Sequence, residues 1–239
     1  MSILAIPVPE RLDPSSVAAM LARMPEMTGA SAVILEGAPE RFCLGMTFIA
    51  ASVSGADRGK ALRHALNSFA SLLEQLLNSP RPTLAVIDGP ALGGGLGLAA
   101  ACDFVLATTR ARFGLPEALY GLAPAIIRPA LLTRLSLQKL NMLLFTCHSR
   151  SAEEALSLGL VDRIVAPDEV ENAKREIVRH YRRVRSETVI AARRRNAATF
   201  AQALNAGVAE TGAALADERV IAALSAAASD EDTPWNGKF

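Results

Sequence analysis

A glycine-rich segment in the middle of the chain carries the strongest chemical signal. Residues 84–124 read LAVIDGPALGGGLGLAAACDFVLATTRARFGLPEALYGLAP, in which Gly93, Gly94 and Gly95 follow an apolar run. We expect a strand to end near Asp88 and a helix to begin at the glycines. The first N–H groups of a helix have no intrahelical acceptor, and the helix dipole makes that end positive. Because glycine leaves the backbone open to a ligand, this segment predicts a site for an anion or a developing oxyanion.

A single carboxylate, Glu117, lies shortly after the glycines in apolar surroundings. Its neighbours include Phe113, Leu115, Ala118 and Leu119. Partial burial among such side chains raises the pKa of a carboxyl group toward neutral pH. A carboxyl group with that pKa can both accept and donate a proton, so Glu117 is a candidate acid and base. The alternative is an exposed glutamate at the start of a helix.

Other catalytic motifs are weaker. Gly95-x-Gly97-x-x-Ala100 fits the glycine fingerprint of dinucleotide sites, but the next strand, FVLATTRA, ends without the acidic residue that this fingerprint requires. The chain has neither a Ser-His-Asp order nor an H-E-x-x-H motif, and we expect no metal. Cys43 and Cys102 lie in apolar surroundings and are expected to be inert core side chains.

The elements that must position these residues alternate between strands and helices. Strands are expected in the continuous apolar runs at 4–8, 31–36, 84–87 and 104–107. Helices are expected at 13–24 and 60–77, from the glycines to about residue 102, and almost throughout beyond residue 130. Asp13 is a predicted N-cap, and Ser151 with Glu154 forms a capping-box sequence. This pattern predicts an α/β core at 1–185 and a helical region at 186–239 that belongs to the same fold.

The composition of the 239 residues excludes several classes of protein. Hydrophobic residues make up 51% of the chain and charged residues 21%, which excludes intrinsic disorder. The formal net charge of +1 gives no overall attraction to nucleic acid or to an anionic membrane. Three widely spaced cysteines without a C-x-x-C pair indicate a reducing compartment. We see no signal peptide and no apolar run of the roughly 20 residues that a membrane span needs, so a cytoplasmic protein is expected.

A basic run, Arg182 to Arg195, contains six arginines without interleaved aromatic residues. Such a run usually forms a solvated helix face. Contact with an acidic carrier protein, a coenzyme A phosphate or RNA stays open as an alternative. A basic surface near the mouth of the site would attract an acidic carrier protein. Single-stranded RNA is disfavoured because aromatic stacking platforms are absent.

Three blocks in order resemble the crotonase (enoyl-CoA hydratase/isomerase) superfamily. They are SAVILEGAPERFCLGM at 31–46, DGPALGGGLGLAAACD at 88–103, and RFGLPEALYGLAP at 112–124 followed by SAEEALSLGLVDRIV at 151–165. The resemblance implies a spiral core of ββα units with a helical C-terminal third. It also implies a homo-oligomer, either a trimer or a hexamer of paired trimers, built through the C-terminal helices at 186–239. The implied substrate is an acyl thioester carried on coenzyme A or phosphopantetheine, without a further cofactor.

The resemblance also assigns roles to individual residues. The backbone N–H groups of Met46 and Gly94 would form an oxyanion hole for the thioester oxygen. Glu117 matches the second of the two glutamates that family hydratases use, whereas the first falls at Gly97 and is missing. The alternatives are a core methionine at 46 and a packing glycine at 94. A lone carboxylate can still pass the α proton to a departing β-hydroxyl, which is dehydration, or to the γ carbon, which is double-bond isomerisation.

The walls of the substrate site are expected to include Leu44, Gly93, Leu115, Tyr120, Arg128 and His148. Arg128 would pair with a carboxylate of the substrate, although a surface arginine beside Pro129 is the simpler interpretation. For His148, which lies just before a helix, the simpler interpretation is a polar loop histidine. Tyr120 would donate to a substrate oxygen or pack against a neighbour.

Within the superfamily, the local motifs are most similar to dehydratases of polyketide β-branching cassettes. The FCLGM loop, the non-acidic residue at 97 and LPEALYGLAPAIIRPALLTRLSLQKL at 115–140 carry this likeness, while Thr47 and Arg128 depart from it. The implied reaction is dehydration of a 3-hydroxy-3-methylglutaryl group on an acyl carrier protein. The alternatives are a coenzyme A-dependent enoyl hydratase or double-bond isomerase, and a non-catalytic subunit that binds acyl thioesters or RNA.

Overall fold

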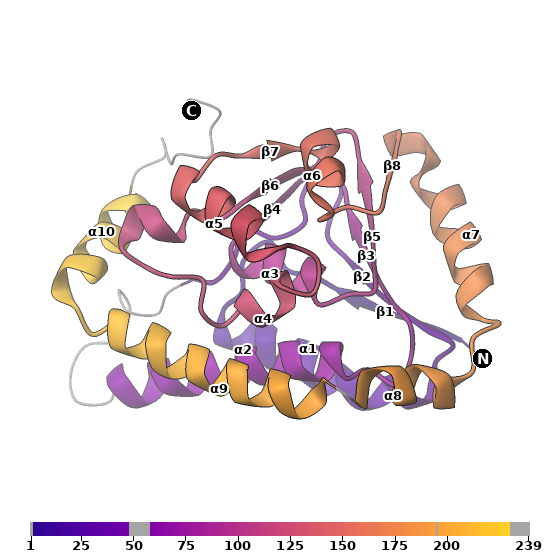
Figure 1. The fold of residues 1–239 in the computed structure, drawn as a ribbon, viewed down its shortest axis with the longest axis horizontal. Helices are drawn as coiled ribbons and strands as arrows, with labels where there is room; N and C mark the ends of the chain where they lie inside the picture. The colour runs from indigo at the N-terminus through magenta and orange to yellow at the C-terminus, as the bar shows by residue number, and fades with distance from the viewer. Residues whose placement is uncertain (1, 48–57, 195, 230–239) are drawn as a thin grey trace.

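A five-stranded parallel sheet forms the centre of the fold (Figure 1). The computed structural model describes residues 2–47, 58–194 and 196–229. The strands lie in the order β1 (Ile3–Pro7), β2 (Ala32–Glu36), β3 (Thr83–Ile87), β5 (Phe104–Thr108) and β8 (Arg163–Val165), and every neighbouring pair is parallel. β3 is buried along its whole length, as a continuous apolar run covered on both faces should be. The predicted α/β fold is confirmed.

A second, smaller sheet begins where two of the central strands end. It consists of β4 (Pro90–Leu92), β6 (Arg112–Gly114) and β7 (Arg150–Ser151), with β6 parallel to β4 and antiparallel to β7. The chain passes from β3 into β4 and from β5 into β6, so both central strands continue into the small sheet. These strands are absent from the sequence prediction, because two or three residues are too few to show a period-2 pattern. β7 and β8 also interrupt the stretch beyond residue 130, which the sequence predicts as almost entirely helical.

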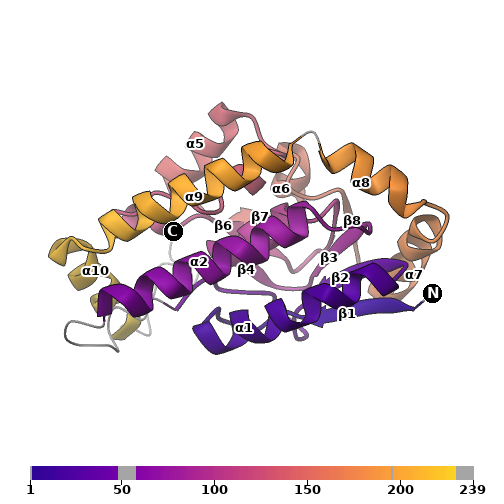
Figure 2. The ribbon, with the colours of Figure 1, turned by 90° about the horizontal axis from the view of Figure 1, so that it is seen from below.

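Helices cover both faces of the central sheet. They are α1 (Pro14–Arg23), α2 (Arg58–Leu77), α3 (Gly94–Ala100), α4 (Arg128–Leu131), α5 (Leu137–Thr146), α6 (Ala152–Leu158), α7 (Val170–Tyr181), α8 (Ser186–Arg194), α9 (Ala197–Ala214) and α10 (Glu218–Ser229), with 3₁₀ turns η1 (Met24–Gly29), η3 (Glu117–Tyr120) and η4 (Pro167–Glu169). On one face Ile177 of α7 packs with Ile34 and Leu106 of the sheet. On the other face α2 packs against α1 and lies alongside α9 (Figure 2). None of the helices in the described ranges is both long and apolar enough to cross a membrane.

Two helix starts follow directly from local sequence. The side chain of Asp13 accepts a hydrogen bond from the N–H of Ser16 at 2.7 Å, and Pro14 occupies the first turn of α1. At α6, the N–H of Ser151 donates to Glu154 Oε2 at 2.8 Å, and the N–H of Glu154 donates to Ser151 Oγ at 3.2 Å. Each contact satisfies a backbone donor that the helix leaves unpaired, so both predicted caps are confirmed.

The C-terminal helices pack onto the core rather than forming a separate body. α9 packs against α2 and α4, and α10 packs against η3, which begins with Glu117. Leu204, Leu215 and Val220 of this region belong to the main hydrophobic core. The last third of the chain therefore helps to shape the surroundings of Glu117.

Candidate active site

A cavity of about 560 Å³ opens where the segments that follow the central strands meet α9 and α10. In parallel sheets, the carboxyl ends of the strands are the usual place for a ligand. The part of its lining that bears on chemistry consists of Arg11, Leu44, Gly45, Met46, Gly93, Gly94, Arg112, Glu117, Tyr120, Ile127, Ser149 and Thr211. Met46 and Gly94 therefore line the same cavity as Glu117.

The loop after β2 is fixed against the segment that carries the glycines. The N–H groups of Phe42 and Cys43 donate to the carbonyl of Pro90 at 3.3 and 2.9 Å, and the N–H of Leu92 donates to the carbonyl of Cys43 at 2.9 Å. Gly45 has a φ of +92°, and a β-carbon there would stand 3.3 Å from the nitrogen of Gly94. Glycine at 45 thus allows the two main chains to approach each other.

The backbone N–H groups of Met46 and Gly94 are the candidate donors in this lining. A β-carbon at Gly94 would stand 3.4 Å from Cγ of Met46, so the two residues are neighbours. Within the described ranges, neither N–H donates to a protein acceptor. Two free backbone donors on one cavity are the arrangement that stabilises negative charge on a carbonyl oxygen.

Glu117 places an unpaired carboxyl oxygen in this cavity. It is the first residue of η3, and its carbonyl accepts from the N–H of Leu122 at 2.9 Å. The residue as a whole is half-buried, but its Oε2 is buried and has no hydrogen-bond partner in the described part of the chain. Burial raises the pKa of Glu117 to about 7. The carboxyl group can therefore take up and release a proton near neutral pH.

At Gly97, where the resemblance implied a first glutamate that this chain lacks, the space for a side chain is closed by a hydrophobic residue. A β-carbon at Gly97 would stand 2.6 Å from Cβ of Ile127 and still closer to its Cγ2, and Ile127 lines the cavity. The cavity lining contains two other carboxylates, Glu10 and Glu40, but both form ion pairs, with Arg41 and Arg110. Among the described lining residues, Glu117 is the one carboxylate without an ion pair.

The sequence model of the enoyl-CoA hydratase/isomerase family matches residues 16–219, which is most of the chain. The chain belongs to the enoyl-CoA hydratase/isomerase family. A crystal structure of an enoyl-CoA hydratase from Bacillus halodurans has the same fold, with a TM-score of 0.80 at 23% identity and coverage of 90% of each chain.

Two curated relatives are similar to this family member over part of their length. A short-chain-enoyl-CoA hydratase from Clostridium acetobutylicum is 36% identical over 148 residues, which cover 61% of this chain and 56% of that protein. The bacillaene synthase dehydratase PksH from Bacillus subtilis is 32% identical over 145 residues, again 61% of this chain and 56% of that protein. The chain thus spans little more than half the length of these relatives.

The predicted wall residues divide into two groups. Leu44, Gly93 and Tyr120 line the cavity. Leu115 is fully buried in the core and does not reach it. Arg128 and His148 are exposed and also lie outside the lining, so the structure does not support a substrate contact for either.

The reason for the last two corrections is local geometry. α4 buries Pro129, Ala130 and Leu131, and this leaves Arg128 on the solvent side of the helix start. Cys147 adopts a left-handed conformation with a φ of +49°, and after this turn Ser149 rather than His148 lines the cavity.

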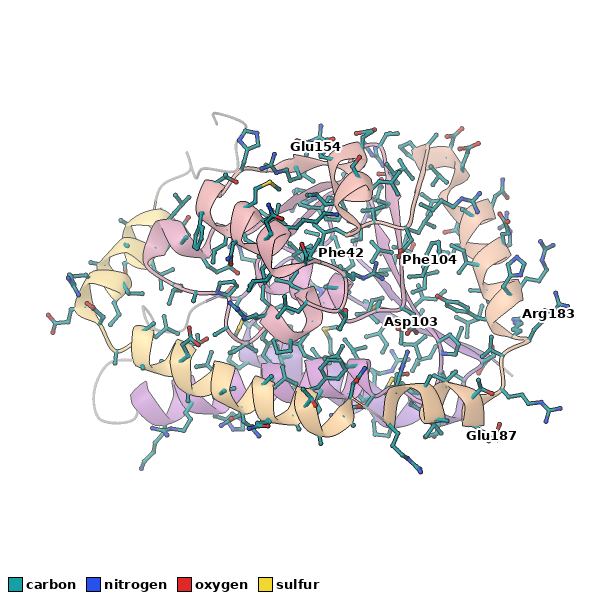
Figure 3. All side chains as sticks on the ribbon, viewed as in Figure 1. Phe42, Asp103, Phe104, Glu154, Arg183 and Glu187 are labelled. Atoms are coloured by element: carbon teal, nitrogen blue, oxygen red, sulfur yellow. The ribbon has the colours of Figure 1, made fainter. Side chains whose placement is uncertain are left out.

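The basic run differs from its prediction in two respects. The run begins directly after α7 and continues through α8, and both helices lie at the opposite end of the molecule from α10, which lines the cavity (Figure 1). Arg183 extends from that outer end (Figure 3), whereas Arg193 is largely buried and donates to the carbonyl of Ser79 and to Asp103. The run is therefore not a basic surface near the mouth of the cavity. Arg195 lies outside the described residues.

Sequence reasoning missed the contribution of the C-terminal helices. Thr211 of α9 and Ile221 and Leu224 of α10 line the cavity, although they lie about a hundred residues beyond Glu117. Ile127 was missed as well. These residues carry no motif, and only the packing of distant helices brings them to the site. The two predicted inert cysteines are buried, and burial raises the pKa of Cys43 to about 11 and that of Cys102 to about 12.

Proposed function

We propose that this protein is a lyase that dehydrates a 3-hydroxyacyl thioester through an enolate. The observation that carries the proposal is the buried, unpaired Oε2 of Glu117 in the same cavity as the free N–H groups of Met46 and Gly94. Removal of an α proton from a thioester drives negative charge onto its carbonyl oxygen. Two preplaced donors stabilise that charge, and in comparable sites one such donor contributes about 3 kcal/mol.

The reaction then needs a single acid–base group. Glu117 removes the α proton, the electron pair of the C–H bond forms a double bond between the α carbon and the carbonyl carbon, and the carbonyl π pair moves onto the oxygen. When the enolate collapses, the oxygen pair restores the carbonyl group, the pair between the α and carbonyl carbons shifts to form the α–β double bond, and the bond between the β carbon and its hydroxyl breaks. Glu117 returns the proton to the departing oxygen, which leaves as water. Carboxylate and substrate account for every atom, and no cofactor is required.

The hydrophobic wall at Ile127 favours this route over a hydratase with two carboxylates. A second carboxylate that would hold a water molecule opposite Glu117 has no room next to Gly97. Isomerisation of a double bond uses the same base and the same enolate, but delivers the proton to the γ carbon. It is the second candidate, because the lone carboxylate fits it equally well.

For the substrate we propose a 3-hydroxy-3-methylglutaryl group on an acyl carrier protein. The similarity to the bacillaene synthase dehydratase and the FCLGM loop support this choice. Arg11 and Arg112 line the cavity and form no ion pair within the described chain, so they can attract a carboxylate or the phosphate of a pantetheine arm. Coenzyme A carries the same arm and is the alternative carrier.

A direct comparison of substrates tests the proposal. Purified protein is incubated with the 3-hydroxy-3-methylglutaryl carrier protein and, separately, with crotonyl-CoA, and the acyl groups are followed by mass spectrometry. The proposal expects loss of the mass of one water from the carrier-bound group and little hydration of crotonyl-CoA. Hydration of crotonyl-CoA without reaction of the carrier-bound group would instead assign a coenzyme A-dependent hydratase.

A further inference from the structure

A cluster around Asp88 joins the two segments that carry Met46 and Gly94. Asp88 lies in the turn between β3 and β4, and its side chain is 19% exposed. Its Oδ1 accepts from Thr108 Oγ1 at 2.7 Å and from Arg110 Nε at 3.2 Å. Its Oδ2 accepts from Arg110 Nη2 at 2.5 Å and from the N–H of Glu40 at 3.2 Å. One carboxylate thus holds a central strand, the turn after it and the loop after β2.

The residue that Asp88 holds in that loop has an unusual backbone conformation. Glu40 has a φ of +62°, which is uncommon for any residue other than glycine. Its N–H is bound by Asp88, and its Oε1 accepts from Arg110 Nη1 at 2.8 Å. Directly after Asp88, a β-carbon at Gly89 would collide with the carbonyl group of Glu40. The loop and the turn are therefore in direct contact and fixed by both main-chain and side-chain bonds.

The contact continues from this cluster to the two amide donors. Next to Gly89, the carbonyl of Pro90 accepts from Phe42 and Cys43, which precede Met46 by a few residues. Pro90 in turn begins β4, which leads to Gly94. Asp88 itself is not part of the cavity lining. A shift of the loop at Glu40 would therefore also move Met46, whereas β4 would hold Gly94 in place. The distance between the two amide groups would then change.

We propose that Asp88 is a positioning residue that sets the separation of the Met46 and Gly94 amide groups. The inference rests on the proposed function of these groups as an oxyanion hole. Donors of this kind act only when they lie within hydrogen-bond distance of the developing oxyanion. A misplacement of about 1 Å in a catalytic group can lower the rate by about 100-fold.

The charge on Asp88 supports this role. Its burial acts to raise the pKa, but hydrogen bonds from Arg110, Thr108 and the N–H of Glu40 outweigh burial and lower the pKa overall. Asp88 is therefore ionised over the range in which Glu117 titrates. The hydrogen bonds and the ion pair of Asp88 therefore keep the same charge state while Glu117 gains or loses its proton.

The chain offers a matched control at the other end of β5. Asp103 accepts from the N–H of Thr83 at 2.7 Å, from Thr83 Oγ1 at 2.9 Å and from Arg193 Nη2 at 2.5 Å. It is likewise a carboxylate that joins a threonine, a backbone N–H and an arginine. It precedes β5, whereas Thr108 ends that strand, and it does not line the cavity of Glu117. Loss of Asp103 removes a similar network without touching the loop that carries Met46.

The experiment compares Asp88→Asn with Asp103→Asn, and adds Arg110→Gln as a milder surface variant in case Asp88→Asn does not fold. Dehydration kinetics give kcat and KM, and thermal melting gives Tm. Polarisation of the carbonyl is read from the red shift in absorbance of bound 4-dimethylaminocinnamoyl-CoA. We expect Asp88→Asn to lower kcat by about 10- to 100-fold with little change in KM, and to reduce the red shift. Arg110→Gln should do the same to a smaller extent, and Asp103→Asn should lower Tm without changing kcat or the shift.

The outcomes separate the two proposals. Equal losses of kcat in the two aspartate variants, or a wild-type kcat and red shift in both Asp88→Asn and Arg110→Gln, would overturn the positioning role and leave the proposed function standing. If the wild-type protein gives neither a red shift nor turnover, the oxyanion hole itself is refuted, and the positioning role falls with it.

Discussion

The carboxylate of Glu117 rests against the main chain of Gly93, where a β-carbon would stand 2.9 Å from Oε1. Gly93 also has a φ of +49°, in the region that favours glycine. Position 93 thus requires glycine for two separate reasons. Because Gly94 follows directly, this one residue keeps the acid next to an amide donor.

Replacement of Gly93 by alanine is expected to lower both stability and turnover. The new methyl group meets Glu117 and the backbone is strained, which costs on the order of 1–3 kcal/mol. We expect turnover to fall at least about tenfold, because the carboxyl group must move. Gly59→Ala is the control, since a β-carbon there meets no atom within 4 Å and the residue lies in α2. Equal kinetics of the two variants in a steady-state assay would contradict the prediction.

Glu117→Gln is expected to abolish turnover and leave the fold intact. The amide cannot take the α proton, and loss of a general base lowers rates by about 10²- to 10⁴-fold. Circular dichroism and the red shift of bound dimethylaminocinnamoyl-CoA should stay close to those of the wild type. Retention of turnover would remove Glu117 from the mechanism.

The pH dependence of stability should report the same carboxyl group. Burial raises the pKa of Glu117 from its ordinary value of 4.5 to about 7, so the folded state binds a proton that the unfolded state releases between these values. Its contribution to the free energy of unfolding is fully present below about pH 4.5 and is lost as the pH rises through 7. The wild type should therefore lose on the order of 3 kcal/mol relative to Glu117→Gln over this interval. Urea unfolding of both proteins at pH 4.5 to 8 measures the difference, and parallel curves would contradict it.

The same group sets the pH dependence of the rate. Glu117 must be ionised to accept the α proton, so kcat for dehydration should rise as the pH passes through about 7. A rate that is constant between pH 5.5 and 8.5 would be inconsistent with a base of this pKa, which steady-state kinetics in overlapping buffers can test (these limits lie about 1.5 units on either side of the pKa).

A second carboxylate can be added only if Ile127 is made smaller. Gly97→Glu alone should fold poorly, because even its β-carbon collides with Ile127. Gly97→Glu combined with Ile127→Ala should recover part of the lost Tm and should hydrate crotonyl-CoA faster than the wild type. Ile127→Ala alone controls for the larger cavity. If the single and double variants at Gly97 melt alike, Ile127 is not what closes this position.

An exposed hydrophobic face on α5 is expected to lie between subunits of the homo-oligomer that the family resemblance implies. Phe145 is 74% exposed and Leu137 50%, and exposed apolar groups of this size mark interaction surfaces. Phe145→Glu should reduce the molar mass measured by light scattering, while Val184→Glu, at an exposed position between α7 and α8, should not. A monomeric wild-type protein would refute the assembly.

The sequence predicts what depends on neighbouring residues and fails where distant segments meet. The capping residues Asp13 and Ser151 and the buried run of β3 are determined locally, so their patterns suffice. The nearness of Met46, Gly94 and Glu117 was available only from the family resemblance, because loop closure leaves no periodic signal. His148 was chosen where Ser149 lines the cavity, because the left-handed conformation of Cys147 just before it has no signature in the sequence.

The part of the cavity wall that α10 supplies has a consequence for biosynthesis. A ribosome completes Glu117 and both amide segments long before it reaches Ile221 and Leu224. A nascent chain can therefore present its reactive groups only in an open, water-filled groove. The cavity can enclose a thioester only after α10 has been translated. A product truncated before α10 would therefore retain Glu117 without the enclosed cavity.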